Sequence, residues 1–139
     1  MRANKGKNTT PELAVRRLLH ALGYRFRLHC RDLPGTPDIV FPGRCKAIQV
    51  HGCFWHQHEG CRRATVPMTR RDYWLPKLAR NRERDAEAER RLASLGWDTA
   101  TVWECEVADS LRLIHRLQCF LGPPSAKPLL PGRRASPSR

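Results

Sequence analysis

The chemically richest part of the chain is the twelve-residue stretch from Val50 to Cys61. It contains three histidines, two cysteines, two glycines and the aromatic pair Phe54–Trp55. Histidine and cysteine are the side chains that bind transition metals and exchange protons near neutral pH, and a buried core segment does not need them at this density. The stretch therefore predicts a metal site, a proton-transfer site or both.

A structural zinc site is the first interpretation of this stretch. Cys53, His58 and Cys61 have the spacing of a zinc loop, and Cys105 is the best fourth ligand. The alternative is that Cys53 and Cys105 are buried thiols and His58 is solvated. We favour zinc because the loop otherwise has almost no apolar residues to hold it together. Four protein ligands leave no open coordination position, so the expected role is structural.

A second set of residues indicates phosphodiester hydrolysis. This reaction needs a divalent cation on hard oxygen ligands and a base for the attacking water. Asp38 can supply one oxygen, the main-chain carbonyl of Val50 another, and His51 or His56 the proton transfer. An isolated aspartate after a turn is more often a cap. The interpretation depends on two histidines converging on the same end of the predicted sheet.

A long helix predicted from Asp72 to Leu95 carries polar residues on its inner stripe. The stripe recurs every three or four positions and consists of Leu78, Asn81, Asp85, Ala88, Leu92 and Leu95. Polar groups on the buried side of a helix need partners, so Asp85 is expected to orient His56 or His51. A solvated helix edge explains the periodicity equally well. The opposite face, rich in arginine and glutamate, is interpreted as solvated surface.

The remaining elements follow from periodicity and turn residues. We expect helices over 10–22 and 107–121 and strands over 26–30, 38–41, 45–50 and 97–103. On the last helix, the buried face is expected to contain Leu111, Ile114, Leu117 and Leu121. This order predicts an α/β sandwich around a mixed sheet. Residues 1–121 are expected to form one domain, and the basic, proline-rich tail 122–139 to be disordered.

Charge and composition indicate a nucleic-acid partner. The formal net charge is +13 and the pI is about 10.5, a field that attracts polyanions. No apolar run approaches the length of a membrane span, and no apolar stretch follows the basic N-terminus, so we expect no membrane association and a cytoplasmic location. Of the six cysteines, Cys30 and either Cys119 or Cys45 are expected to be buried small hydrophobes.

Two aromatic pairs lie next to basic segments. Phe54–Trp55 and Tyr73–Trp74 suit base stacking or insertion into a duplex. Core packing is the alternative, and for Tyr73 it is equally favoured.

Taken together, the motifs resemble those of the very short patch repair (Vsr) mismatch endonucleases. The resemblance is carried by four segments: Leu33-Pro34-Gly35-Thr36-Pro37-Asp38, His51-Gly52-Cys53-Phe54-Trp55-His56, Tyr73-Trp74-Leu75-Pro76-Lys77 with Asn81 and Asp85, and Trp103-Glu104-Cys105. It covers residues 1–121. It implies a three-layer fold like that of restriction endonucleases. It also implies an enzyme that nicks DNA 5′ to the thymine of a T:G mismatch, and such mismatches arise when 5-methylcytosine deaminates.

The resemblance also implies a role for each matching residue. Asp38 matches a magnesium-binding aspartate, His51 and His56 the active-site histidines, Asp85 their acid partner and Glu12 a helix glutamate linked to the same site. Cys53, His58, Cys61 and Cys105 match structural zinc ligands. Phe54, Trp55 and Trp74 match aromatics that enter DNA beside the mismatch, and Asn81 belongs to the same DNA-binding set. The implied partners are mismatched double-stranded DNA bound by a monomer associated with the bacterial nucleoid, with functional links to a DNA cytosine methyltransferase and mismatch repair proteins.

Several positions depart from the family pattern. Val50 stands where some members have threonine, which preserves a carbonyl ligand but removes a hydroxyl, and Gln49 occupies the acid position of the wider nuclease pattern. One extra residue precedes Cys61. Met1–Ala3 match the interior of an N-terminal DNA-contacting segment, so either the start codon is misassigned or the arm is lost and the mismatch is held less tightly.

Two other functions remain open from the sequence. One is a restriction-type DNA endonuclease without mismatch specificity. The other is an inactive, zinc-stabilised DNA-binding module, which would have no need for Asp38, His51, His56 and Asp85.

Overall fold

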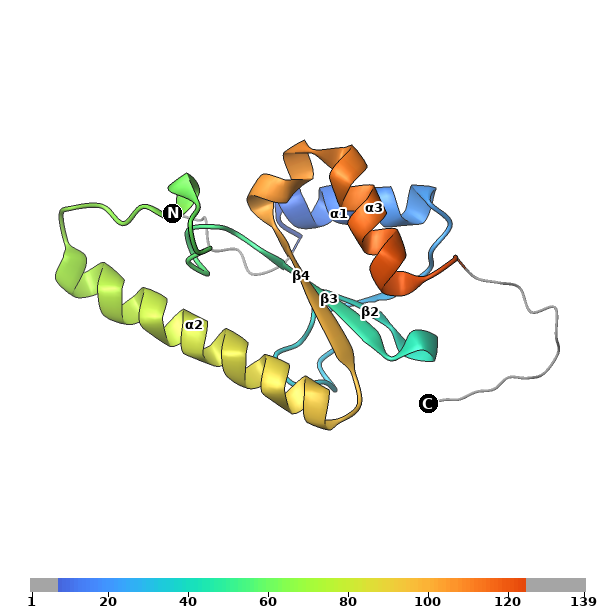
Figure 1. The fold of residues 1–139 in the computed structure, drawn as a ribbon. Helices are drawn as coiled ribbons and strands as arrows, with labels where there is room; N and C mark the ends of the chain where they lie inside the picture. The colour runs from blue at the N-terminus through green and yellow to red at the C-terminus, as the bar shows by residue number, and fades with distance from the viewer. Residues whose placement is uncertain (1–7, 125–139) are drawn as a thin grey trace, which may run out of the picture.

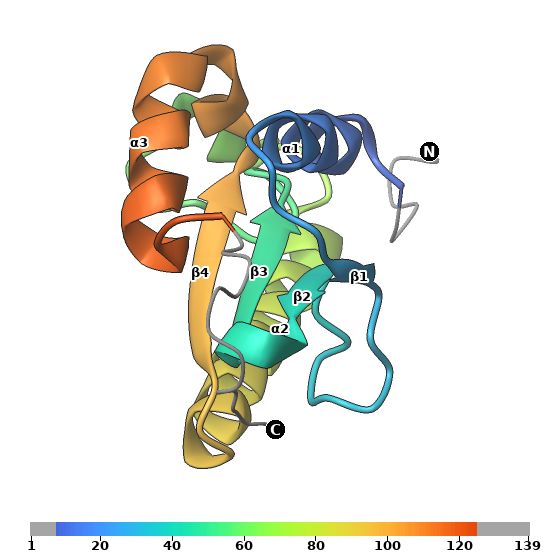
Figure 2. The same ribbon diagram turned by 90° about the vertical axis from the view of Figure 1, so that its right-hand side faces the viewer.

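The computed structural model describes residues 8–124, which form three layers around a four-stranded sheet (Figure 1). In chain order the main elements are α1 (Thr10–Ala21), β1 (Arg27–Leu28), β2 (Ile39–Phe41), β3 (Lys46–His51), α2 (Arg71–Ser94), β4 (Asp98–Trp103) and α3 (Ser110–Leu121). Helices α1 and α3 cover one face of the sheet and α2 lies on the other (Figure 2). The predicted order of helices and strands and the α/β fold class are confirmed.

The sheet is mixed, as predicted, with the order β1-β2-β3-β4. Strands β1, β2 and β3 are antiparallel neighbours, while β3 and β4 run parallel with Val50 opposite Val102. A parallel pair needs a long crossover connection, and the Cys53–Cys61 loop followed by α2 provides it. Consequently the loop leaves the sheet at the end of β3, next to the end of β4.

The two faces of the sheet differ because side chains alternate along each strand. Ile48 and Val102 are buried with α1 and α3 in the hydrophobic core. The core consists of Val15, Leu19, Tyr24, Ile39, Phe41, Ile48, Val102, Leu113, Leu117 and Leu121. Gln49, Thr99 and Thr101 instead line a cavity beside α2. One face is therefore closed and apolar, and the other is open and polar.

Helix α2 places its polar residues toward the sheet. Leu78 and Leu92 are buried, and Asn81 and Asp85 between them are half-buried. Pro76 is the sixth residue of the helix, where it removes one main-chain hydrogen bond without ending the helix. The predicted inner stripe is confirmed except at Leu95, which is 60% exposed just beyond the end of the helix.

The predicted buried face of the last helix is wrong in part. A 3₁₀ helix (Glu104–Ala108) precedes α3, which starts at Ser110 after the cap residue Asp109. Leu113, Leu117 and Leu121 are buried, whereas Leu111 is 80% exposed. At about 100° per residue, Leu111 lies roughly 120° around the helix from Leu117. Spacing of three and six residues therefore does not keep it on the core face.

The cysteines outside the predicted zinc set are not core residues. Cys119 is exposed on α3, and Cys30 and Cys45 are only half-buried. The prediction that Cys119 is a small buried hydrophobe is wrong, because it lies on the solvent side of α3. Burial was overestimated for Cys30 and Cys45, which lie in the turns that flank β2.

The described chain ends just after α3. Arg44 donates hydrogen bonds to the carbonyls of Leu121 (2.7 Å) and Pro123 (2.8 Å), and the Tyr24 hydroxyl donates to that of Gly122. The predicted disordered tail falls mostly outside the described residues, as does the N-terminal segment 1–7. Within residues 8–124, no helix is long and apolar enough to cross a membrane.

Candidate active site and metal site

Asp38 directly precedes β2 and contacts the end of β3. Its Oδ2 accepts a hydrogen bond from the main-chain N–H of Val50 at 2.8 Å. In a strand, the N–H and C=O of one residue face the same edge. The carbonyl of Val50 is therefore on the Asp38 side of β3, as its predicted role beside Asp38 requires.

Burial raises the pKa of Asp38 to about 6 from an ordinary value of 3.8. The Val50 N–H opposes this rise, and the nearby Glu12 carboxylate adds to it. A carboxylate that is costly to charge in this position gains most from a bound cation. The chemistry of the site thus fits a divalent ion with oxygen ligands.

The two predicted active-site histidines are brought together at the end of β3. The rings of His51 and His56 are stacked, with centroids 3.8 Å apart and planes 7° apart. His56 Nδ1 lies 2.6 Å from Oδ2 of Asp85 on α2. Since an ionised carboxylate can only accept, Nδ1 of His56 carries the proton and Nε2 is left as the acceptor of the neutral ring.

His51 is buried and uncharged near neutral pH. Burial lowers the pKa of its imidazole to about 4 from 6.5, and the adjacent His56 lowers it further. Its Nδ1 has no hydrogen-bond partner within residues 8–124. A buried nitrogen without a partner is uncommon, and a substrate or water group is the natural occupant.

Glu12, which only the family resemblance pointed to, is buried at this site. Its Oε2 lies 2.7 Å from Nε2 of His29 and 3.3 Å from Nη1 of Arg16, and its Oε1 accepts from the N–H of Asn8 at 3.0 Å. His29 is a site residue that the sequence did not reveal. The available signal was its position directly after the first strand, opposite Asp38 in the hairpin.

A single cavity joins these groups. It has a volume of about 1000 Å³ and is lined by Asp38, His29, His51, His56 and Asp85 among others. The polar face of the sheet forms its floor and α2 one wall. The predicted catalytic residues Asp38, His51, His56 and Asp85 therefore line one cavity, whereas Glu12 contacts His29 and does not line it.

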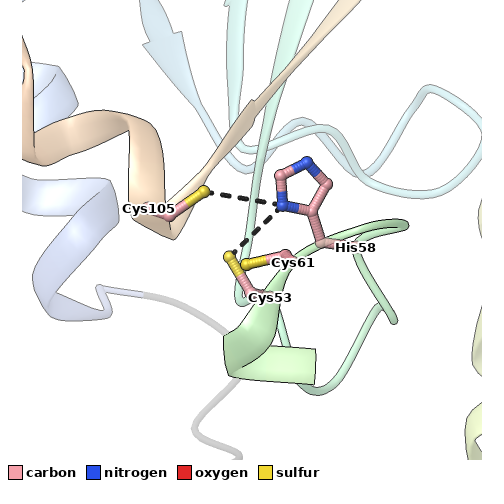
Figure 3. A group of neighbouring side chains, drawn as sticks. All are labelled: Cys53, His58, Cys61 and Cys105. Atoms are coloured by element: carbon pink, nitrogen blue, oxygen red, sulfur yellow. Dashed lines mark hydrogen bonds between the residues drawn. The ribbon is translucent and has the colours of Figure 1, made fainter. Parts of the chain in front are cut away.

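The predicted zinc ligands form a second cluster. One ligand atom from each of Cys53, His58, Cys61 and Cys105 lies within 4.8 Å of the others (Figure 3). His58 Nδ1 is 3.7 Å from Sγ of Cys53 and 3.5 Å from Sγ of Cys105. Three thiols and one imidazole converging in this way are a donor set that can hold a tetrahedral metal ion.

Burial raises the pKa of the Cys53 thiol to about 12 and also raises that of Cys105. The pKa of Cys61 is lowered, chiefly by a hydrogen bond from the main chain at Arg63. A bound cation favours thiolate over thiol, so metal binding would release protons from Cys53 and Cys105.

Trp103, at the end of β4, contacts both clusters. Its ring stacks on His58 with centroids 4.2 Å apart and planes 8° apart, and meets His51 edge-on at 5.3 Å. Glu104 then accepts from the main-chain N–H of Cys53 at 3.2 Å. Through these two contacts, the loop that carries His56 and the zinc-type ligands is held against the end of β4.

The predicted DNA-binding aromatics form one group. Phe54 lies 5.1 Å from Trp55 and 5.2 Å from Trp74 between ring centroids, and Trp55 and Trp74 are 5.7 Å apart. All three are half-buried, and Tyr73 beside them is 45% exposed. Asn81 Nδ2 donates to the carbonyl of Trp55 at 3.0 Å, so it positions this group from α2.

A solved structure shares this fold. The catalytic domain of the homing endonuclease I-Bth0305I superposes with a TM-score of 0.57, covering 81% of this chain and 94% of that domain at 19% identity. The chain therefore has the fold of an endonuclease catalytic domain, in agreement with the predicted restriction-endonuclease-like architecture.

Sequence relatives define the family. The family model described as DNA mismatch endonuclease Vsr matches residues 1–63. The type II nicking enzyme V.XorIIP of Xanthomonas oryzae pv. oryzae is 56% identical over 123 residues, which are 88% of this chain and 90% of that protein. The DNA mismatch endonuclease Vsr of Escherichia coli is 43% identical over 105 residues, 76% and 67% of the two chains. The type II nicking enzyme V.NaeI of Lentzea aerocolonigenes is 41% identical over 128 residues, which are 85% of this chain and 76% of that protein. The chain belongs to the Vsr family of DNA mismatch endonucleases, as its motifs predicted.

Proposed function

We propose that the protein is a magnesium-dependent DNA endonuclease that nicks one strand 5′ to the thymine of a T:G mismatch. The observation that carries this proposal is the convergence of the Asp38 carboxylate and the His56–Asp85 pair on one cavity. The printed names of the relatives, a mismatch endonuclease and nicking enzymes, support the same reaction.

His56 is the general base in this proposal. Asp85 holds the proton on Nδ1, which leaves the Nε2 lone pair free to take a proton from the attacking water. The carboxylate also stabilises the imidazolium that forms. His51 stays neutral beside it, and its stacked ring fixes the orientation of His56.

Asp38 and the main-chain carbonyl of Val50 would hold the magnesium ion. When bound, magnesium supplies positive charge that offsets the negative charge developing on the phosphate. The Cys53, His58, Cys61 and Cys105 cluster would hold zinc in a structural role, because four protein ligands leave no position for substrate.

Phe54, Trp55 and Trp74 are proposed to enter the duplex beside the mismatch. Unstacking a base step costs a few kcal/mol, and a T:G wobble pair is already weaker than a Watson–Crick pair. The net charge of +13 provides a sequence-independent attraction to the phosphates. Specificity would then come from the cost of inserting the aromatic group.

A circular DNA carrying one T:G pair tests this proposal. One copy of each catalytic residue can cut only one strand per binding event, so a monomer should convert supercoiled DNA to open circles in the presence of magnesium. Asp38→Ala should abolish nicking while retaining zinc and fold. Asp32→Ala, at an exposed position in the same turn, is the matched control. A linear product, or full activity of Asp38→Ala, would refute the proposal.

A further inference from the structure

Glu12, His29 and Asp38 form a cluster from three separate segments of the chain. Glu12 lies on α1, His29 directly follows β1, and Asp38 directly precedes β2. One ligand atom from each lies within 4.8 Å of the others. The magnesium proposal above uses Asp38 and Val50 and leaves the imidazole of His29 without a role.

We infer that His29 supplies a nitrogen ligand, and Glu12 a second carboxylate, to the divalent cation held at Asp38. This donor set should bind a first-row transition-metal ion such as Co²⁺ more tightly than Mg²⁺, and Mg²⁺ held by the same residues still supports the proposed nicking. The inference rests on the proposed nuclease function, which identifies Asp38 as a cation ligand.

The donor chemistry separates the two classes of cation. Mg²⁺ is a hard ion that prefers oxygen ligands and gives up its waters reluctantly. Imidazole nitrogen binds later first-row dications more strongly. An aspartate and a main-chain carbonyl alone would suit magnesium, and adding the His29 ring shifts the preference toward transition metals.

The ligands are held in place by the protein itself. The side chain of Glu12 is only 2% exposed, fixed by the Asn8 N–H and by Arg16. Its Oε2 lies 2.7 Å from His29 Nε2, so the two groups already meet where a shared ion would hold them. The main-chain N–H of His29 donates to the carbonyl of Asp38 at 2.9 Å, which keeps these two residues in register.

The neighbouring histidine pair does not offer an equivalent site. A metal ion lies near the plane of each imidazole that binds it. The rings of His51 and His56 are parallel within 7° and stacked at 3.8 Å, so their in-plane lone pairs cannot converge on one ion. Of the two clusters, the one formed by Glu12, His29 and Asp38 is therefore the better suited to coordinate a metal ion directly.

Cation affinity measured without DNA tests the inference. Calorimetric titrations of Co²⁺ and of Mg²⁺ into the zinc-loaded full-length protein should show tighter binding of Co²⁺. His29→Gln keeps a hydrogen-bond donor for Glu12 but removes the imidazole. We expect it to weaken Co²⁺ binding tenfold or more and Mg²⁺ binding about twofold or less. His20→Gln, the same change at an exposed position on α1, should alter neither.

A second measurement does not depend on any variant. Paramagnetic Co²⁺ should broaden or shift the ring resonances of His29 in the wild-type protein. Unchanged His29 resonances, or equal Co²⁺ affinity in His29→Gln and wild type, would overturn the inference and leave His29–Glu12 as a simple ion pair. Failure of the nuclease proposal is distinguishable, since the wild-type protein would then not nick DNA in magnesium while its Co²⁺ binding still depended on His29.

Discussion

At the scale of single residues, the histidines of the site differ in what a ring nitrogen contacts. His56 faces the carboxylate of Asp85 at 2.6 Å, and His58 faces two cysteine sulfurs. His51 Nδ1, in contrast, is buried without a partner among the described residues. Because the partner of one ring nitrogen sets the tautomer and charge of an imidazole, neighbouring histidines can have separate functions.

Two alanine variants test whether His56 and His58 have separate roles. His56→Ala should retain zinc and DNA binding but lose at least about 100-fold in nicking rate, the usual contribution of a general base. His58→Ala should lose zinc and stability. Metal analysis, duplex affinity and nicking rate are measured on both proteins. Indistinguishable behaviour of the two variants would show that the roles were wrongly assigned.

Asp38 and His51 should impose opposite pH dependences on stability. The folded-state pKa of Asp38 is raised to about 6, so its contribution to stability is present below pH 3.8 and is lost as pH rises through 6. The folded-state pKa of His51 is lowered to about 4, so its contribution is present above pH 6.5 and is lost as pH falls through 4. Between about pH 4 and pH 6, the stability lost at Asp38 as pH rises is therefore offset by the stability gained at His51.

The Asp38→Asn variant should show only the pH dependence of stability that comes from His51. Between pH 5 and 7 in magnesium-free buffer with zinc, the variant should gain stability over wild type as pH rises, by about 1.4 kcal/mol. Urea unfolding at several pH values measures the difference, and Asp32→Asn serves as the control. A difference that does not vary with pH would mean that Asp38 is not desolvated as its surroundings indicate.

At the scale of elements, the Cys53–Cys61 loop is held by β4 rather than by apolar packing of its own. Trp103 stacks on His58, and Glu104 contacts both the Cys53 N–H and the Arg63 guanidinium (3.6 Å). His56 belongs to the same loop. The position of the proposed base therefore depends on the cysteine cluster.

Removing one ligand should affect both structure and activity. Cys105→Ser should release zinc and lower the free energy of unfolding by several kcal/mol, because metal binding contributes directly to folding. Nicking should decline as the loop loses its anchor. Cys119→Ser, at an exposed thiol on α3, should have little effect. Metal analysis and thermal unfolding provide the comparison, and wild-type protein purified without zinc would contradict the account.

At the scale of the whole molecule, the open polar face of the sheet and a strongly positive charge suit a DNA duplex. Arg31 and Arg82 line the cavity from opposite elements, the β1–β2 connection and α2. Within residues 8–124 neither forms an ion pair with a carboxylate, whereas Arg90 on the outer side of α2 pairs with Glu87. Unpaired guanidinium groups beside the site are available to phosphates.

The salt dependence of DNA affinity should differ between variants of Arg82 and Arg90. Arg82→Gln should weaken binding to duplexes of any sequence and reduce the slope of log affinity against log salt by about 1. Arg90→Gln should change the slope less. Affinities measured at several salt concentrations in the absence of divalent cations give both slopes. Equal slopes for the two variants would place the DNA elsewhere on the surface.

Much of this architecture follows from local sequence patterns. The order of elements comes from hydrophobic periodicity and turn residues, and the clustering of Asp38 with His51 follows from the hairpin between β2 and β3. The His29–Glu12 contact joins residues 17 apart through the packing of α1 on the sheet, which no local pattern encodes. The buried face of α3 was predicted wrongly at Leu111 because a spacing of six residues turns it away from Leu117 and the core.

The cutting of paired T:G and T:A duplexes shows whether the protein recognises the mismatch. Each strand carries its own label, and the two substrates differ at one base and are compared at fixed salt with magnesium. We expect a nick in the thymine strand of the T:G duplex only. We also expect that Trp55→Ala or Trp74→Ala reduces the preference for T:G more than the overall affinity for duplex. Equal cutting of the T:G and T:A duplexes would contradict mismatch recognition and favour a restriction-type nuclease.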